Sequence, residues 1–261
     1  MTKPVLRLIH NLARAGGTII NRCVGSMAGV FLLSEINPRG LHRFNPIFQA
    51  DRWFNLLSPA DLNSIGDPHA AGLNSMIKLI HQRVEERGGH LILRDWNHLD
   101  FLAVPFESKP TNRLSLAEAM SDDFELRQIA IVRHPLDQAR STVRILPKNN
   151  IPTAEYIFSA QRRFAEAIYD IGFIRYEDFV LNPDLELRKI CTALDVAFDP
   201  EYREKWPSYK NITGDTESVS MERSAISMSQ RKRQSSPEFM KKLLSNADYR
   251  KTCEILNYPI E

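Results

Sequence analysis

A glycine-containing segment near the start of the chain has the residue types that bind phosphate. It is the stretch His10 to Ile20, which reads HNLARAGGTII. Val5 to Ile9, directly before it, is mainly branched and apolar and predicts a buried parallel strand, whereas Thr18 to Leu33 is expected to be helical. Gly16 and Gly17 would let the backbone approach an anion closely, and free N–H groups at the helix start would point at it. The sequence therefore predicts a phosphate-binding turn between strand and helix.

This segment differs from a nucleotide P-loop at the residue that reaches the terminal phosphates of ATP. In the pattern G-x-x-x-x-G-K-S/T, that residue is the lysine. Here Asn11 stands at the first position and Gly16, Gly17 and Thr18 at the last three, so that a glycine replaces the lysine. The nearest cation is Arg14, inside the loop. A kinase or ATP-hydrolysing P-loop is therefore disfavoured, and a P-loop nucleotide kinase is kept as an alternative.

A second segment with anion-binding residue types follows the predicted strand Ile129 to Val132 and reads RHPLDQARS. Pro135 suits the first turn of a helix, and Asp137 is favourable near the positive end of its dipole. Arg133 would lie at the strand tip, with Ser141 two turns into the helix. We expect these two side chains to converge on one anion.

Residues suited to proton transfer follow a third predicted strand, His90 to Arg94. In an open parallel sheet, ligands bind beyond the carboxyl ends of the strands. His98 is the first choice for a general base because an imidazole titrates near neutral pH. Asp95 is the second choice, because a carboxylate would need burial to raise its pKa.

Strands alternate with helices along the chain, which predicts an α/β fold with a central parallel sheet flanked by helices. A fourth strand is expected at Gly172 to Arg175, and a fifth is not visible in the sequence. The 261 residues suit a single domain, residues 1–261. The irregular section 34–69 is expected to be a helical or loop insertion, either packed on the core or acting as a lid over the site.

On these segments the chain resembles the sulfotransferases. Their phosphosulfate loop reads K/R-S-G-S/T-T, and Arg14 to Thr18 lies on that pattern with Ala15 and Gly17 replacing two hydroxyl residues. Their 3′-phosphate motif, R-x-P-x-D-x-x-x-S, is matched by Arg133 to Ser141 at all five defined positions. The resemblance implies a P-loop NTPase-like three-layer sandwich. It also implies sulfuryl transfer from 3′-phosphoadenosine 5′-phosphosulfate to a hydroxyl or amine, with no metal required.

The resemblance also implies a role for each matching residue. Arg14 would stabilise charge on the leaving phosphate, and Tyr176 would help hold the adenine. The basic triplet Arg231 to Arg233 would fold onto the 3′-phosphate. The nucleotide-binding residues expected on this basis are Arg14, Ala15, Gly16, Gly17, Thr18, Arg133, Ser141, Tyr176, Arg231, Lys232 and Arg233. Because Ala15 and Gly17 remove two side-chain donors, a non-catalytic nucleotide-binding module with this fold is a further alternative.

Composition narrows the choice of partners. A net charge of +2 argues against nucleic acid as the main ligand. Three cysteines far apart in the sequence suggest a reducing compartment, and we expect a cytoplasmic protein. The longest apolar stretch, Val24 to Leu33, is about half of the ~20 residues that span a bilayer, so no membrane association is expected. The acceptor is expected to be a small molecule or a carbohydrate. The sequence does not indicate an oligomeric state.

Overall fold

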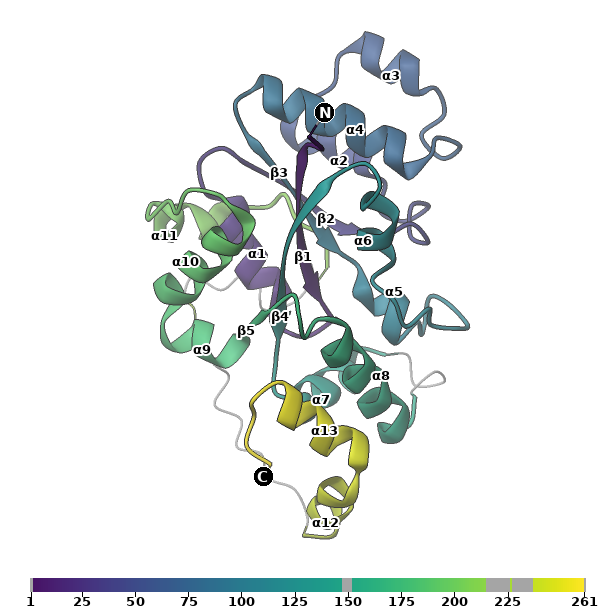
Figure 1. The fold of residues 1–261 in the computed structure, drawn as a ribbon, viewed down its shortest axis with the longest axis vertical. Coiled ribbons are helices and arrows are strands. Elements are labelled where there is room, and N and C mark those ends of the chain that lie inside the picture. The colour runs from purple at the N-terminus through teal and green to yellow at the C-terminus, as the bar shows by residue number, and fades with distance from the viewer. Residues whose placement is uncertain (1, 147–151, 215–225, 227–236, 261) are drawn as a thin grey trace.

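Five parallel strands form the centre of the molecule (Figure 1). The computed structural model describes residues 2–146, 152–214, 226 and 237–260. Across the sheet the strands follow the order β2-β3-β1-β4-β5. Their bounds are β1 Val5–Asn11, β2 Val30–Ile36, β3 His90–Asp95, β4 Glu125–Val132 and β5 Phe173–Arg175. Because all pairs are parallel, the five carboxyl ends lie at one edge of the sheet, where sites in such folds are built.

Helices cover both faces of the sheet, which confirms the predicted three-layer α/β sandwich. One face carries α1 Gly17–Gly25, α9 Tyr176–Leu181, α10 Pro183–Leu194, α11 Tyr202–Lys205 and the 3-10 helix η2 Trp206–Ser208. The other face carries α2 Pro46–Phe54, α4 Leu73–Glu86, α5 Asn97–Phe101, α6 Ser115–Met120, α7 Pro135–Ile145, α8 Ala154–Ala167, α12 Pro237–Ser245 and α13 Ala247–Ile255. A further helix, α3 Pro59–Ile65, packs beside α4.

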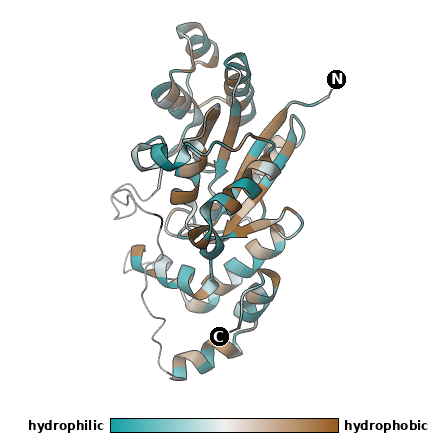
Figure 2. Cartoon of the chain, turned by 90° about the vertical axis from the view of Figure 1, so that its left-hand side faces the viewer, coloured by the Kyte–Doolittle hydropathy of each residue, from teal (hydrophilic) through white to brown (hydrophobic). Residues whose placement is uncertain are grey.

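The strands are apolar on both faces because both are covered. Along β4, Ile129 and Ile131 join the core beneath α1 and α10, whereas Ala130 and Val132 join the core beneath α7 and α8. Figure 2 shows the strands largely in the hydrophobic colour, with hydrophilic residues on the helices around them. Within the described residues, no helix is long and apolar enough to cross a bilayer.

The helix predicted from Thr18 to Leu33 is wrong in its second half. Helix α1 ends at Gly25, and Val30–Ile36 forms strand β2, which is the fifth strand. Gly29 has φ +73°, a left-handed conformation that turns the chain between the two elements. The apolar run that suggested one helix therefore belongs to a helix end and a buried strand, and residues 34–36 are strand as well.

After β2, the insertion predicted at 34–69 contains the short helices α2 and α3. Its aromatic residues pack on neighbouring elements: the rings of Phe54 and Phe31 lie 5.3 Å apart, and those of Phe44 and Trp96 lie 4.9 Å apart. These contacts agree with a helical insertion packed on the core, and the residues of this section that lie near the strand ends are described with the site below.

Candidate functional site

The loop after β1 is held in a conformation that requires glycine. Arg14 and Gly16 have φ values of +67° and +84°, and Gly16 is the N-cap of α1. A Cβ on Gly16 would lie 2.1 Å from Cδ2 of Tyr176, and a Cβ on Gly17 would lie 2.6 Å from Oδ1 of Asn11. The loop is therefore packed against side chains below it and leaves the N–H groups at the α1 start to face the edge of the sheet.

The two anion-binding segments predicted from the sequence contact each other directly. The Arg14 Nε donates a hydrogen bond to the Ser141 hydroxyl at 2.9 Å. The Arg133 guanidinium donates to the Arg14 carbonyl at 3.3 Å, and the Gln138 amide donates to the Ala13 carbonyl at 3.0 Å. This contact follows from the topology, because β1 and β4 are neighbours and both segments begin at their carboxyl ends.

Tyr176 closes one side of this arrangement. It begins α9 directly after β5, and only 6% of its surface is exposed. Its ring lies against Gly16 and under the Arg133 guanidinium, whose carbon is 5.1 Å from the ring centroid. The Arg133 Nε is buried and has no hydrogen-bond partner among the described residues. A buried unsatisfied donor is costly, and an anion bound here would satisfy it.

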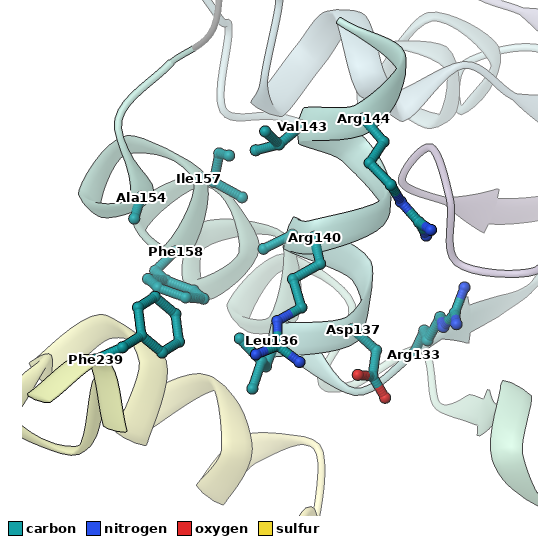
Figure 3. Close-up of a pocket in the computed structure, with 11 residues that line it drawn as sticks. Arg133, Leu136, Asp137, Arg140, Val143, Arg144, Ala154, Ile157, Phe158 and Phe239 are labelled. Carbon is teal, nitrogen blue, oxygen red and sulfur yellow. The ribbon is translucent and has the colours of Figure 1, made fainter. Parts of the chain in front are cut away.

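A cavity of about 510 Å³ lies beside α7 (Figure 3). Arg133, Arg140 and Arg144 line it from the β4 tip and α7, and Phe158 of α8 and Phe239 of α12 add aromatic surface. In Figure 3 the side chains of Arg133 and Arg144 extend to the same side of α7. Arg144 was not selected from the sequence, although its position one turn beyond Ser141 in a helix was a usable signal.

A second cavity of about 680 Å³ joins the loop to the tips of β2 and β3. Arg14 and Thr18 line it on the loop side and His98 on the β3 side. Its remaining lining residues are Ala13, Glu35, Arg43, Phe44, Arg94, Trp96, Pro105, Phe106, Ile145, Leu146, Ile212, Thr213 and Gly214. The structure thus brings the predicted base and the predicted phosphate loop into one space.

The ring nitrogens of His98 are differentiated by their surroundings. His98 lies in α5 and is 3% exposed, and its Nε2 is 2.6 Å from the Val104 carbonyl. A carbonyl only accepts, so Nε2 carries the proton of the neutral ring and Nδ1 carries the lone pair. Burial lowers the pKa of His98 below its ordinary value, and the hydrogen bond to Val104 opposes this in part. The ring is therefore neutral at physiological pH and can accept a proton.

Asp95 occupies a different place from the one expected of a base. Its carboxylate accepts hydrogen bonds from His10 Nδ1 at 3.0 Å and from the Asn97 amide at 2.7 Å. The side chain is fully buried, and it is not among the residues that line the cavity. Its visible role is to fix the β3 tip against β1.

Arg94 and Glu35 place two opposite charges close together in the cavity lining. The buried Arg94 guanidinium donates to Asn11 Oδ1 and to the Ser34 hydroxyl, and burial lowers its pKa while Glu35 raises it. The Glu35 carboxylate lies 3.8 Å from Arg94, and its backbone has φ +58°. The register of β2 against β3 shifts between Ser34 and Ile36, so Glu35 sits at a bulge, a feature that re-aims side chains. Recognition of β2 in the sequence would have pointed to Glu35 as a strand-end residue.

The triplet Arg231, Lys232 and Arg233 lies outside the described residues. Its expected contact with a 3′-phosphate stays a prediction.

Comparison with solved structures shows which fold this geometry belongs to. The chain is similar to the sulfotransferase domain from the Synechococcus PCC 7002 olefin synthase, with a TM-score of 0.72 and 18% identity over 99% of this chain and 97% of that one. It is also similar to the sulfotransferase domain from the curacin biosynthetic pathway, with a TM-score of 0.65 and 16% identity over the full length of both chains. No protein-family model and no curated protein matches the sequence. The chain therefore has the fold of sulfotransferase domains.

Proposed function

We propose that this protein is a sulfotransferase that uses 3′-phosphoadenosine 5′-phosphosulfate as sulfuryl donor. The observation that carries the proposal is the direct contact between the two anion-binding segments, Arg14 with Ser141 and Arg133 with the Arg14 carbonyl. A nucleotide with phosphates on both its 5′ and 3′ positions needs two neighbouring anion sites, one for each phosphate. A nucleotide with phosphates at the 5′ position alone would use only the first.

In this proposal, the loop residues Arg14 to Thr18 and the N-terminus of α1 bind the 5′-phosphosulfate. Arg133 and Ser141 bind the 3′-phosphate, and the unsatisfied Arg133 Nε fits that role. Arg144 lies in the adjoining cavity and adds positive charge. Tyr176 supports the loop from below and contributes to the adenine side. Charge-assisted hydrogen bonds of this kind supply much of the affinity for phosphates.

The transfer itself needs in-line positioning, charge stabilisation and one proton acceptor. The bond between sulfur and the bridging oxygen of the 5′-phosphate breaks as sulfur forms a new bond to the acceptor oxygen or nitrogen. Arg14 and the α1 N–H groups stabilise the charge that grows on the bridging oxygen. We assign His98 Nδ1 as the base that takes the acceptor's proton, because it is neutral and lines the cavity with Arg14. The products are the sulfated acceptor and 3′,5′-bisphosphoadenosine.

Of the two carboxylates nearby, neither is our first assignment. Asp95 is bonded to His10 and Asn97 and is absent from the cavity lining. Glu35 does line the cavity and lies beside the buried Arg94 cation, and we assign it to neutralising that charge. Glu35 is the rival base that the experiments have to separate from His98.

We expect a small-molecule or carbohydrate acceptor with a hydroxyl or amine. A cytoplasmic location stays a prediction, and it is supported by the three buried cysteines Cys23, Cys191 and Cys253, which form no disulfide.

A calorimetric titration with 3′,5′-bisphosphoadenosine, 5′-AMP and ATP with Mg²⁺ tests the donor assignment. The bisphosphate should bind at least about tenfold more tightly than 5′-AMP, because each lost charge-assisted contact costs roughly 1.5–3 kcal/mol. Preference for ATP would favour the kinase alternative and overturn the proposal. Sulfate transfer from the donor to a panel of phenols, alcohols and amines then separates an enzyme from a non-catalytic module.

A further inference from the structure

The cavity between the loop and the β3 tip has a wall made of aromatic rings. The Phe44 and Trp96 centroids are 4.9 Å apart, and those of Trp96 and Phe106 are 5.1 Å apart. His98 adjoins the same wall, with its ring centroid 6.0 Å from that of Phe106. The planes of Phe44 and Trp96 are inclined by 71° and those of Trp96 and Phe106 by 58°, so the rings form a stepped apolar surface on which an apolar molecule gains contact area.

Charge in this cavity is unevenly balanced. Arg14, Arg43 and Arg94 line it together with the single carboxylate of Glu35. Glu35 is the residue beside Arg94, and Arg14 bonds to Ser141 and belongs to the phosphosulfate loop. The Glu35 carboxylate lies beside Arg94, so among the described lining residues no carboxylate is left to neutralise Arg43.

Among the described residues, the Arg43 guanidinium has no anionic partner. Its carbon lies 4.9 Å from the centroid of Phe106, and it forms no side-chain hydrogen bond or ion pair with any residue in the described ranges. The N–H donors of a guanidinium lie in the plane of the group. When the guanidinium lies over an aromatic ring, these donors stay available to a ligand beside the ring. That geometry is suited to two parallel hydrogen bonds with a carboxylate.

We infer that the acceptor of this protein is an anionic hydroxy compound. Its carboxylate or similar anion binds to Arg43, its apolar body lies on the Phe44–Trp96–Phe106 wall, and its hydroxyl faces His98. The acceptor role of the ligand rests on the proposed function, whereas the anion site at Arg43 rests on the cavity alone. The same charge would exclude cationic amines, so within the proposed acceptor classes it selects hydroxyl compounds.

Two probes that differ only in charge test this inference: 4-hydroxyphenylacetate and 4-hydroxyphenylacetamide. Their binding is measured by titration calorimetry, with the protein free and saturated with 3′,5′-bisphosphoadenosine. The carboxylate should bind about tenfold or more tightly than the amide, because hydrogen bonds between charged groups are worth roughly 1.5–3 kcal/mol. In Arg43→Gln the two probes should bind equally, and Arg43→Lys should keep part of the preference.

Arg52→Gln is the matched control. Arg52 is also exposed and stacked on a phenylalanine, with its guanidinium carbon 5.3 Å from the Phe48 centroid, but it does not line the cavity. The control variant should keep the full preference for the carboxylate. Equal binding of both probes to the unmodified protein, no binding of either, or a preference that survives in Arg43→Gln would each overturn the inference. If the unmodified protein does not bind 3′,5′-bisphosphoadenosine but still prefers the carboxylate probe, the proposed function is overturned and the anion site at Arg43 is retained.

Discussion

The two sides of the candidate site are built by different means. The phosphate side comprises Arg14–Thr18 and Arg133–Ser141, two continuous segments at the tips of the adjacent strands β1 and β4. The proposed acceptor side comprises residues from the ends of β2 and β3, from the segments that follow them and from α5: Glu35, Arg43, Phe44, Arg94, Trp96, His98 and Phe106. The first side presents backbone N–H groups and arginines. The second presents aromatic rings together with the largely buried ion pair of Arg94 and Glu35.

Under the proposed function, this difference follows from what each side would bind. A phosphate is small and always the same shape, so a fixed turn with glycines can be specified by a few adjacent residues. An acceptor varies in size and charge, so its pocket depends on side chains brought from several segments by tertiary packing. We therefore expect changes on the phosphate side to alter nucleotide affinity and changes on the acceptor side to alter turnover.

The largest effect should come from His98→Asn. Turnover should fall about 10²–10⁴-fold, the usual contribution of a general base, while the affinity for 3′,5′-bisphosphoadenosine stays unchanged. Because burial lowers the His98 pKa, the rate of the unmodified protein should lose less than half of its value as the pH drops from 7.5 to the ordinary histidine pKa of about 6.5. Steady-state kinetics and calorimetry measure both. Near-normal turnover in this variant with an inactive Glu35→Gln would make Glu35 the base.

The next effect should be the loss of stability in Gly16→Ala. The new Cβ would meet Tyr176 at 2.1 Å with φ at +84°, so unfolding free energy should fall by about 2–4 kcal/mol. Gly172→Ala is the control, because Gly172 has φ +85° and no heavy atom within 4 Å of an added Cβ. In a Tyr176→Ala background, the cost at Gly16 should approach the cost at Gly172. Urea denaturation measures the unfolding free energy of Gly16→Ala, Gly172→Ala, Tyr176→Ala and the double variant. If Gly16→Ala and Gly172→Ala lose the same unfolding free energy, Tyr176 does not constrain the loop.

Arg133→Met should weaken binding of 3′,5′-bisphosphoadenosine by about 10- to 100-fold, since a charged hydrogen-bond donor is removed. Affinity for adenosine 5′-phosphosulfate, which lacks the 3′-phosphate, should change little. Arg127→Met serves as control, because Arg127 lies exposed on the same strand and pairs with Glu125 at 2.8 Å. If the affinities for both nucleotides fall equally, Arg133 does not bind the 3′-phosphate.

The smallest expected effect is a pH-dependent change in stability caused by Asp100, a buried residue of α5. Its carboxylate accepts hydrogen bonds from Asn37, Thr111 and Ser115, and burial, assisted by the charge of Asp95, raises its pKa to about 6. The folded protein then binds a proton more tightly than the unfolded chain does. Stability is therefore lost as the pH rises from the unfolded pKa to the folded one.

This contribution to the free energy of unfolding should fall by about 2 kcal/mol between pH 4 and 6. Asp100→Asn should remove this component of the pH dependence, as measured by denaturation at several pH values. If the unfolding free energy of the variant depends on pH as that of the unmodified protein does, a group other than Asp100 causes this dependence.

The sequence placed the two predicted anion-binding segments at strand ends, as the structure has them, because both motifs are local. Strand, turn and helix start follow one another within about a dozen residues, so Arg133 and Ser141 could be placed without knowing the neighbours. The acceptor side could not be predicted in the same way. Glu35 lies on a strand that the sequence pattern predicts as the end of a helix. Asp95 is the second choice for the base in the sequence, but its carboxylate bonds to His10, 85 residues away in the chain. The aromatic wall depends on contacts between residues far apart in the chain.

The strand order has a consequence for how the chain assembles. β1 and β2 are successive in the sequence, but β3 lies between them, so the first two strands cannot pair with each other. During synthesis the sheet can begin only when residues 90–95 have emerged and inserted between strands made earlier. Pairings of this long range are slow to form because the intervening chain must close first. The insertion of β3 is thus the event that joins the Glu35 end of the molecule to the glycine loop.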